Sequence, residues 1–175
     1  MRDFYSDGSL DTLVQTLRIR RTIDRQTLDS LLKFRFTTET DAAAEASRHV
    51  TAKDIEYLTS NLQRKEEHLA DIPVLTECDY DFHYKIVAVS GNIVSKLVFQ
   101  SFKPVYSFFT EFFYSLAGAP QTSLALNRKL LEALKRGDKH SSFEAMGDIL
   151  KFGEKKIYEA IDERDQLIVI RRAMG

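Results

Sequence analysis

Apolar residues recur at intervals of three and four along nearly the whole chain, and this spacing constrains the fold more than any other feature of the sequence. Such recurrence puts apolar side chains on one side of a helix, whereas a half-buried strand would show strict alternation. Only 7 Gly and 3 Pro interrupt the pattern over 175 residues. The sequence therefore predicts an all-α protein, an antiparallel bundle of about six to seven helices, and no strand is expected.

Length and charge limit what such a bundle does. A chain of 175 residues fits one domain, and a formal net charge of −1 creates no long-range field that would attract nucleic acid. The single cysteine, Cys78, cannot form an internal disulfide, and no apolar run reaches the roughly 18 residues of a membrane span. The residues after Met1 lack the apolar core of a signal peptide. We therefore expect a cytoplasmic protein that contacts no membrane.

Capping and breaking residues divide the chain into helices. Ser9, the Thr51–Asp54 pair and Asp71 before Pro73 are start signals, and Gly91 and Gly137 are stop signals. The expected helices are a short connector after Ser9, then 24–49, 51–69, 71–90, 93–116 with a kink at Pro104, 121–135 and 138–161. This gives a linker with its connecting helix at 1–22, an effector-binding bundle at 23–162 and a C-terminal tail at 163–175.

Two pairs of polar residues carry the spacing of neighbours on one helix face. Arg35 and Glu39 lie four apart inside an apolar stripe, so both are expected to point inward. Two interpretations stay open: an internal ion pair, or a guanidinium that is offered to a bound carboxylate or phosphate. Asp79 and His83 have the same spacing, which fits either a hydrogen-bonded pair or a grip on one ion or ligand.

The third helix and the fifth helix differ in character. The many charges of the third predict a solvated outer face without chemistry. The fifth carries aromatic residues at threes and fours, which favour core packing, although part of this stripe could line an apolar ligand cavity or a subunit contact. These aromatic residues are Phe99, Phe102, Tyr106, Phe109 and Phe113.

Tests for familiar catalytic patterns are negative. The sequence has no glycine-rich phosphate loop, no cysteine pair for zinc, no G-x-S-x-G and no H-E-x-x-H. The Glu-x-x-His pattern of di-iron helical bundles is also missing. We therefore do not expect an enzyme.

Four segments in fixed order, 35–39 (RFTTE), 79–83 (DYDFH), 90–92 (SGN) and 127–138 (NRKLLEALKRGD), resemble the FadR C-terminal domain family of GntR-type transcriptional regulators. The resemblance covers nearly the whole chain. The first eleven residues also resemble the linker that follows the winged helix-turn-helix of these regulators, so we expect a DNA-binding domain to precede this one. The resemblance implies a homodimer that contacts DNA only through that absent domain.

The resemblance also implies a metal site that this sequence fills only in part. Many family members bind a divalent metal, such as Zn or Ni, through an Asp and a His four apart and two later His. Asp79 and His83 match the first pair, but the later positions carry Asn127 and Ile149. Zinc usually takes three or four protein ligands, so this set is poor for it, and no cofactor is certain. The loss of ligands, and residues 123–126, resemble the acyl-CoA-responsive branch of the family.

The sequence thus predicts an effector-binding and dimerisation domain that senses a fatty acyl-CoA, a fatty acid or a small organic acid and controls DNA binding. Two alternatives are a metal-dependent helical-bundle hydrolase acting at Asp79 and His83, and a purely structural dimerisation module with a filled core. The candidate effector-binding residues are Arg35, Asp79, His83, Asn92, Tyr106, Asn127, Ile149 and Gly153.

Overall fold

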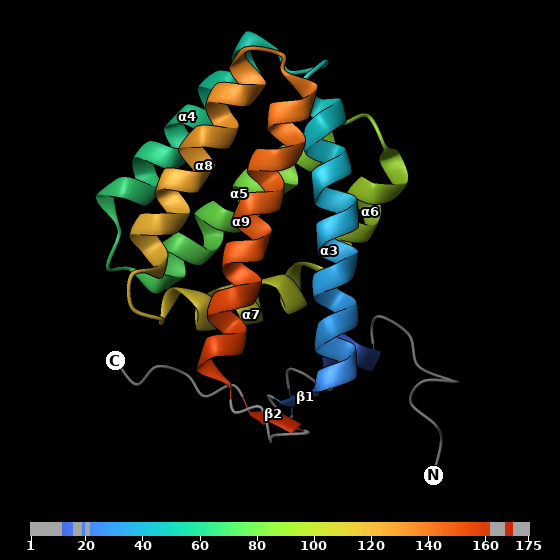
Figure 1. The fold of residues 1–175 in the computed structure, drawn as a ribbon, viewed down its shortest axis with the longest axis vertical. Helices are drawn as coiled ribbons and strands as arrows, with labels where there is room; N and C mark the ends of the chain where they lie inside the picture. The colour runs from blue at the N-terminus through green and yellow to red at the C-terminus, as the bar shows by residue number, and fades with distance from the viewer. Residues whose placement is uncertain (1–11, 16–18, 20–21, 162–166, 170–175) are drawn as a thin grey trace.

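The structure is a computed structural model that describes residues 12–15, 19, 22–161 and 167–169. Within these residues it is a bundle of seven helices, labelled α3 to α9 in Figure 1, and the all-α prediction is confirmed. Their bounds are α3 Arg25–Ala46, α4 Ala52–Glu67, α5 Ile72–Val89, α6 Ile93–Ser101, α7 Lys103–Tyr114, α8 Ala119–Lys135 and α9 Lys139–Ala160. Of the predicted connector helix, only residues 12–15 and 19 are described, and they are helical.

Local capping chemistry explains most of the helix starts. Thr51 and Asp54 form the expected capping box at the start of α4, and the Asp71 carboxylate accepts a hydrogen bond from the Val74 amide at the start of α5. Gly91 follows α5 with a φ of 83°, a left-handed conformation that strains any residue with a Cβ. These signals lie within a few residues of each other, so the sequence alone could locate them.

The expected kink at Pro104 is a complete break. The chain leaves α6 after Ser101 and restarts as α7 at Lys103, with Pro104 in the first turn. Proline has no amide hydrogen to donate to the carbonyl one turn earlier, and it is tolerated where that donor is not needed. As a result α7 crosses the lower end of the bundle, as Figure 1 shows, and does not extend α6.

The layers follow from which helices touch. α9 packs on α3 and on α8, and α5 packs on α3, α4 and α7, so α5 lies inside a ring of neighbours. Figure 1 shows α3, α9 and α8 side by side, with α5 behind them. The five aromatic residues of the 99–113 stripe are all buried, as core packing predicts, and two of them, Phe109 and Phe113, also line a cavity.

Two three-residue strands, β1 (Thr22–Asp24) and β2 (Leu167–Val169), pair antiparallel with Ile23 opposite Ile168. The sequence did not predict this pairing. It lies below the ends of α3 and α9 in Figure 1, so it joins the chain before the bundle to the chain after it.

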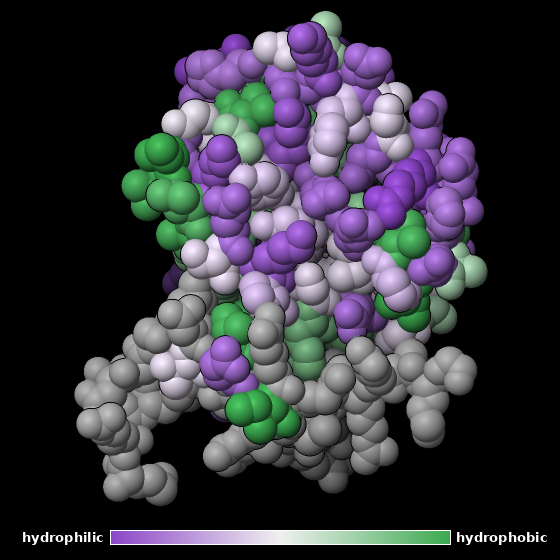
Figure 2. Space-filling view, turned by 180° about the vertical axis from the view of Figure 1, so that it is seen from behind, coloured by the Kyte–Doolittle hydropathy of each residue, from purple (hydrophilic) through white to green (hydrophobic). Residues whose placement is uncertain are grey.

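The surface seen in Figure 2 is mostly polar, and apolar side chains gather on the edge formed by α6. There Ile93, Val94 and Leu97 are more than half exposed. Of the helices that the structure describes, none combines the length and the apolar character needed to cross a bilayer.

Candidate ligand cavity

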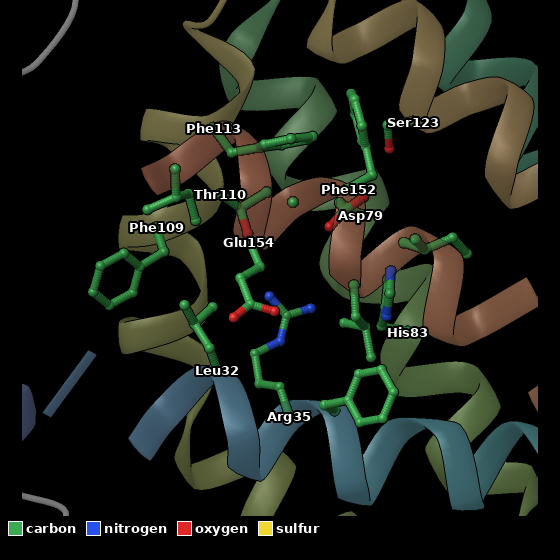
Figure 3. A pocket seen from close by; sticks show the side chains of 15 residues that line it. Leu32, Arg35, Asp79, His83, Phe109, Thr110, Phe113, Ser123, Phe152 and Glu154 are labelled. Atoms are coloured by element: carbon green, nitrogen blue, oxygen red, sulfur yellow. The ribbon is translucent and has the colours of Figure 1, made fainter. Parts of the chain in front are cut away.

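A partly open cavity of about 50 Å³ lies between α3, α5, α7, α8 and α9. Its walls are mainly apolar, and Figure 3 shows polar side chains reaching into it from several helices. A volume of this kind has room for roughly three or four water molecules, since one water needs about 10–15 Å³. Five of the predicted site residues line it: Arg35, Asp79, His83, Ile149 and Gly153.

Arg35 and Glu39 form the inward ion pair that the sequence allowed. The Arg35 Nε donates to Glu39 Oε1 at 2.6 Å, and its guanidinium lies over the Tyr106 ring with Cζ 4.3 Å from the centroid. Its two terminal amino groups have no hydrogen-bond partner among the described residues. The arginine is therefore both paired through Nε and open towards the cavity, so the two interpretations are compatible.

Glu39 is fully buried and is shared between two cationic or donor groups. Burial alone would raise the pKa of its carboxyl, but the positive charge of Arg35 and the contact with His83 outweigh that and lower the pKa. Glu39 Oε2 accepts a hydrogen bond from His83 Nδ1, since an ionised carboxylate has no proton to give. The His83 ring is thereby held in one orientation, with Nδ1 carrying the hydrogen.

The other ring nitrogen of His83, Nε2, is buried and has no hydrogen-bond partner in the part of the chain that the structure describes. His83 itself is fully buried and lines the cavity. Buried polar atoms are almost always paired, so an unpaired nitrogen on a residue that lines a cavity is a candidate contact for a water or a ligand.

Asp79 also lines the cavity, but both of its carboxylate oxygens already accept hydrogen bonds. Its Oδ1 accepts from Lys65 Nζ at 3.0 Å and from the Tyr114 hydroxyl, and its Oδ2 accepts from the Tyr106 hydroxyl at 2.7 Å. Burial by itself would raise the pKa of the Asp79 carboxyl. The Lys65 and His83 charges and the two tyrosine hydrogen bonds outweigh it and hold that pKa well below its usual range.

Lys65 is the buried residue of the polar cluster that the sequence analysis missed. It lies on α4, which was expected to present only a solvated face, yet its side chain is fully buried against Asp79 and Ser123. The signal was present: Leu58, Leu62 and Lys65 recur at four and three, and they are the buried residues of α4. Because α4 carries many charged residues, the sequence analysis did not distinguish the one lysine that lies on its buried side.

The remaining candidate residues divide by position. Tyr106 is buried beside the cavity and bonds Asp79, and Asn127 is fully buried with its Nδ2 lacking a partner among the described residues. Asn92 lies away from the cavity: it is exposed and caps α6 by accepting hydrogen bonds from the amides of Val94 and Ser95. The structure therefore does not bring Asn92 to the others.

The residues at the Asp79–His83 pair do not fit the metal that the resemblance implies. No group of three or more His, Cys, Asp or Glu within the described ranges could hold a metal ion. Both Asp79 oxygens already accept from Lys65 and two tyrosines, the His83 Nδ1 bonds Glu39, and Ile149 offers no ligand atom. A lysine ammonium stands beside the carboxylate where a cation would be needed.

The structure is thus an all-α bundle in which a polar cluster lies beside a cavity, an arrangement suited to holding a small ligand. Residues 30–152 match the FCD domain family, and the chain belongs to this family. Its coarse role is therefore that of a regulatory domain of the GntR type.

Solved structures share the fold at low sequence identity. E. coli McbR/YncC superimposes with a TM-score of 0.71 at 16% identity, over 86% of this chain and 78% of that one. Streptococcus agalactiae GntR superimposes with a TM-score of 0.58 at 19% identity, over 86% of this chain and 62% of that one. No curated protein matched the sequence.

Proposed function

We propose that this domain senses a small organic acid, which binds in the inner cavity with its carboxylate between Arg35 and His83. The observation that carries the proposal is that two groups without a partner among the described residues lie at one cavity: the terminal amino groups of Arg35, which are donors, and the buried Nε2 of His83. Guanidinium groups bind carboxylates through two parallel hydrogen bonds, and His83 Nε2 could accept a hydrogen bond from a hydroxyl group of the ligand or from a bridging water.

The cavity volume favours a small acid over a fatty acyl chain. About 50 Å³ admits the carboxylate head of an acid, and the remaining atoms of propionate or lactate would extend towards the neighbouring groove, whereas a long alkyl chain inside the cavity would have to displace Phe109, Phe113 or Phe152 from packed positions. A wider, open groove between α3 and α9 shares Leu32, Phe36 and Glu154 with the cavity, and we propose it as the route inward.

Regulation requires that the ligand prefer one arrangement of the helices. An acid between Arg35 and His83 would tie α3 to α5, and the first residue of α3 directly follows β1. A difference in affinity of ~1–3 kcal/mol between two arrangements would suffice to change how a preceding DNA-binding domain is held. We propose that the domain acts in the cytoplasm as a homodimer and contacts DNA only through that preceding domain, without catalysing a reaction.

A thermal-shift panel tests this function. Acetate, propionate and lactate should raise the unfolding temperature in proportion to their affinity, and the matching neutral amides should not. Arg35→Lys keeps the charge beside Glu39 but loses the fork, so it should weaken acid binding at least tenfold, because a charged hydrogen bond contributes ~1.5–3 kcal/mol. Arg128→Lys, in an exposed pair with Glu66, is the matched control and should change nothing.

Each contrary result points to a different protein. A fatty acyl-CoA retained through purification and detected by native mass spectrometry would replace the small acid by an acyl effector. Hydrolytic turnover with bound metal would support the hydrolase alternative. No shift with any of the acids would leave a structural dimerisation module.

A further inference from the structure

Lys65 is held in a setting that leaves its charge no contact with water. Its side chain is fully buried, and Nζ donates to Asp79 Oδ1 and to Ser123 Oγ, each at 3.0 Å. The third side of the ammonium faces the Tyr114 ring, with Nζ 5.1 Å from the centroid. Lysine is almost never fully buried unless it is paired, so this position is specific to the charge and not to the length of the side chain.

The two hydrogen-bond partners of Lys65, Asp79 and Ser123, also line the cavity, and Asp79 stands near the two groups proposed to hold the ligand. An unneutralised carboxylate in that wall would repel an anion strongly, because charges interact over several ångströms in a buried, weakly screened site. Of the two carboxylates that line the cavity, Glu154 is exposed to solvent and Asp79 is buried, so binding of an acid depends on a positive charge that offsets Asp79.

A divalent metal is one way to supply that charge, but the protein atoms around Asp79 are unsuited to binding a metal. The ammonium of Lys65 supplies it from within the chain, on the side of Asp79 shared with Ser123 and Tyr114. Ser123 Oγ in turn contacts Tyr114 Oη at 3.0 Å, so the ammonium, the carboxylate and both hydroxyls form one continuous network. Such a network holds its geometry because every member has a partner.

We infer that Lys65 is a built-in replacement for a metal ion: it neutralises Asp79 permanently and makes acid binding by this domain independent of metal. This inference rests on the proposed function, since it concerns the same cavity. Lys65 is a positioning residue and does not touch the ligand itself. The effector class becomes a free small carboxylate and not a metal chelate.

The first experiment compares metal dependence. Propionate affinity is measured by calorimetry on protein treated with EDTA, and again with one equivalent of Zn²⁺ or Ni²⁺ added back, while native mass spectrometry records the metal content. We expect affinities that agree within about twofold and a mass without stoichiometric metal. Acid binding that is lost in EDTA and restored by either metal would overturn the inference.

The second experiment removes the charges in two steps. Lys65→Met leaves Asp79 unneutralised, so propionate affinity should fall at least tenfold, whereas Lys65→Met with Asp79→Asn removes both charges and should recover it to within about threefold. The control is Arg64→Met, one residue before Lys65, which breaks an exposed ion pair with Glu77. This variant should bind propionate as the wild type does. A single variant that binds normally, or a folded double variant that does not bind, would refute the role of Lys65.

The two proposals fail separately. If the wild type binds none of the acids, the proposed function is wrong, while its metal content still tests whether Lys65 replaces a metal ion: stoichiometric Zn²⁺ or Ni²⁺ in the wild type would overturn that claim. If Lys65→Met does not fold, the double variant carries the test, because it lacks the unpaired charge.

Discussion

The bundle holds two inward-pointing ion pairs, and they differ in how many of their polar groups have a partner within the protein. Lys65 and Asp79 join α4 to α5, and each of their polar atoms finds a partner in Ser123, Tyr106 or Tyr114. Arg35 and Glu39 lie one turn apart on α3, and the adjoining His83 keeps an unpaired nitrogen beside the cavity. We call Lys65–Asp79 the sealed pair, because its polar atoms have partners within the protein, and Arg35–Glu39 the open pair.

This contrast separates structural from functional burial of charge. A sealed pair offsets the loss of hydration with internal hydrogen bonds, so it orders the helices without needing a ligand. An open pair leaves donors without acceptors in a space that water or a small acid can occupy. The two pairs share Tyr106, which bonds Asp79 and lies under the Arg35 guanidinium, so the sealed pair supports the open one.

Removing the lysine from the sealed pair should have the largest effect on stability. Lys65→Met leaves Asp79 as an uncompensated buried charge, and breaking such a pair from one side costs ~3–5 kcal/mol of unfolding free energy. Arg64→Met, next to it on the exposed face of α4, should cost ~0–1 kcal/mol because its pair with Glu77 is solvated. Urea unfolding of both variants measures the difference, and equal midpoints would show that Lys65–Asp79 is no more important than a surface pair.

The sequence predicted the open pair and not the sealed one, for a physical reason. Arg35 and Glu39 are four residues apart on one helix, so their spacing alone brings them together. Lys65 meets Asp79 and Ser123 across 14 and 58 residues of chain, and such contacts depend on how helices pack. The pairing of β1 with β2 is nonlocal in the same way. Asn92 shows the opposite error, since a local cap was taken for a site residue.

The second-largest expected effect is a loss of unfolding free energy at acid pH, caused by protonation of Asp79. The folded pKa of Asp79 lies below its usual value, so the unfolded chain binds more protons at acid pH, and stability from this group is complete above about pH 4 and falls below it. Tyr106 and Tyr114 stay protonated, because burial raises their pKa values further. At 1.36 kcal/mol per pKa unit, the wild type should lose ~2 kcal/mol more than the Lys65→Met, Asp79→Asn variant between pH 5 and pH 2.5.

Parallel acid titrations of the two proteins, followed by urea unfolding at each pH, measure this difference. The depressed Glu39 carboxyl is present in both, so its contribution cancels in the comparison. Curves with the same slope would mean that Asp79 is not held ionised by Lys65, and the sealed pair would then be an uncharged hydrogen bond.

The smallest expected effect comes from alanine substitutions at the two glycines of α9, which differ in what a Cβ at each position would contact. A Cβ at Gly153 would meet nothing within 4 Å and the residue lines the cavity, while a Cβ at Gly147 would lie 3.6 Å from the Phe36 ring. Glycine inside a helix costs ~0.5–1 kcal/mol relative to alanine, so Gly153→Ala and Gly147→Ala should each stabilise the fold by about that amount. Only Gly153→Ala narrows the open site, and it should weaken lactate more than acetate in the thermal-shift panel. Equal effects of the two variants on lactate would place the acid elsewhere than beside Arg35 and His83.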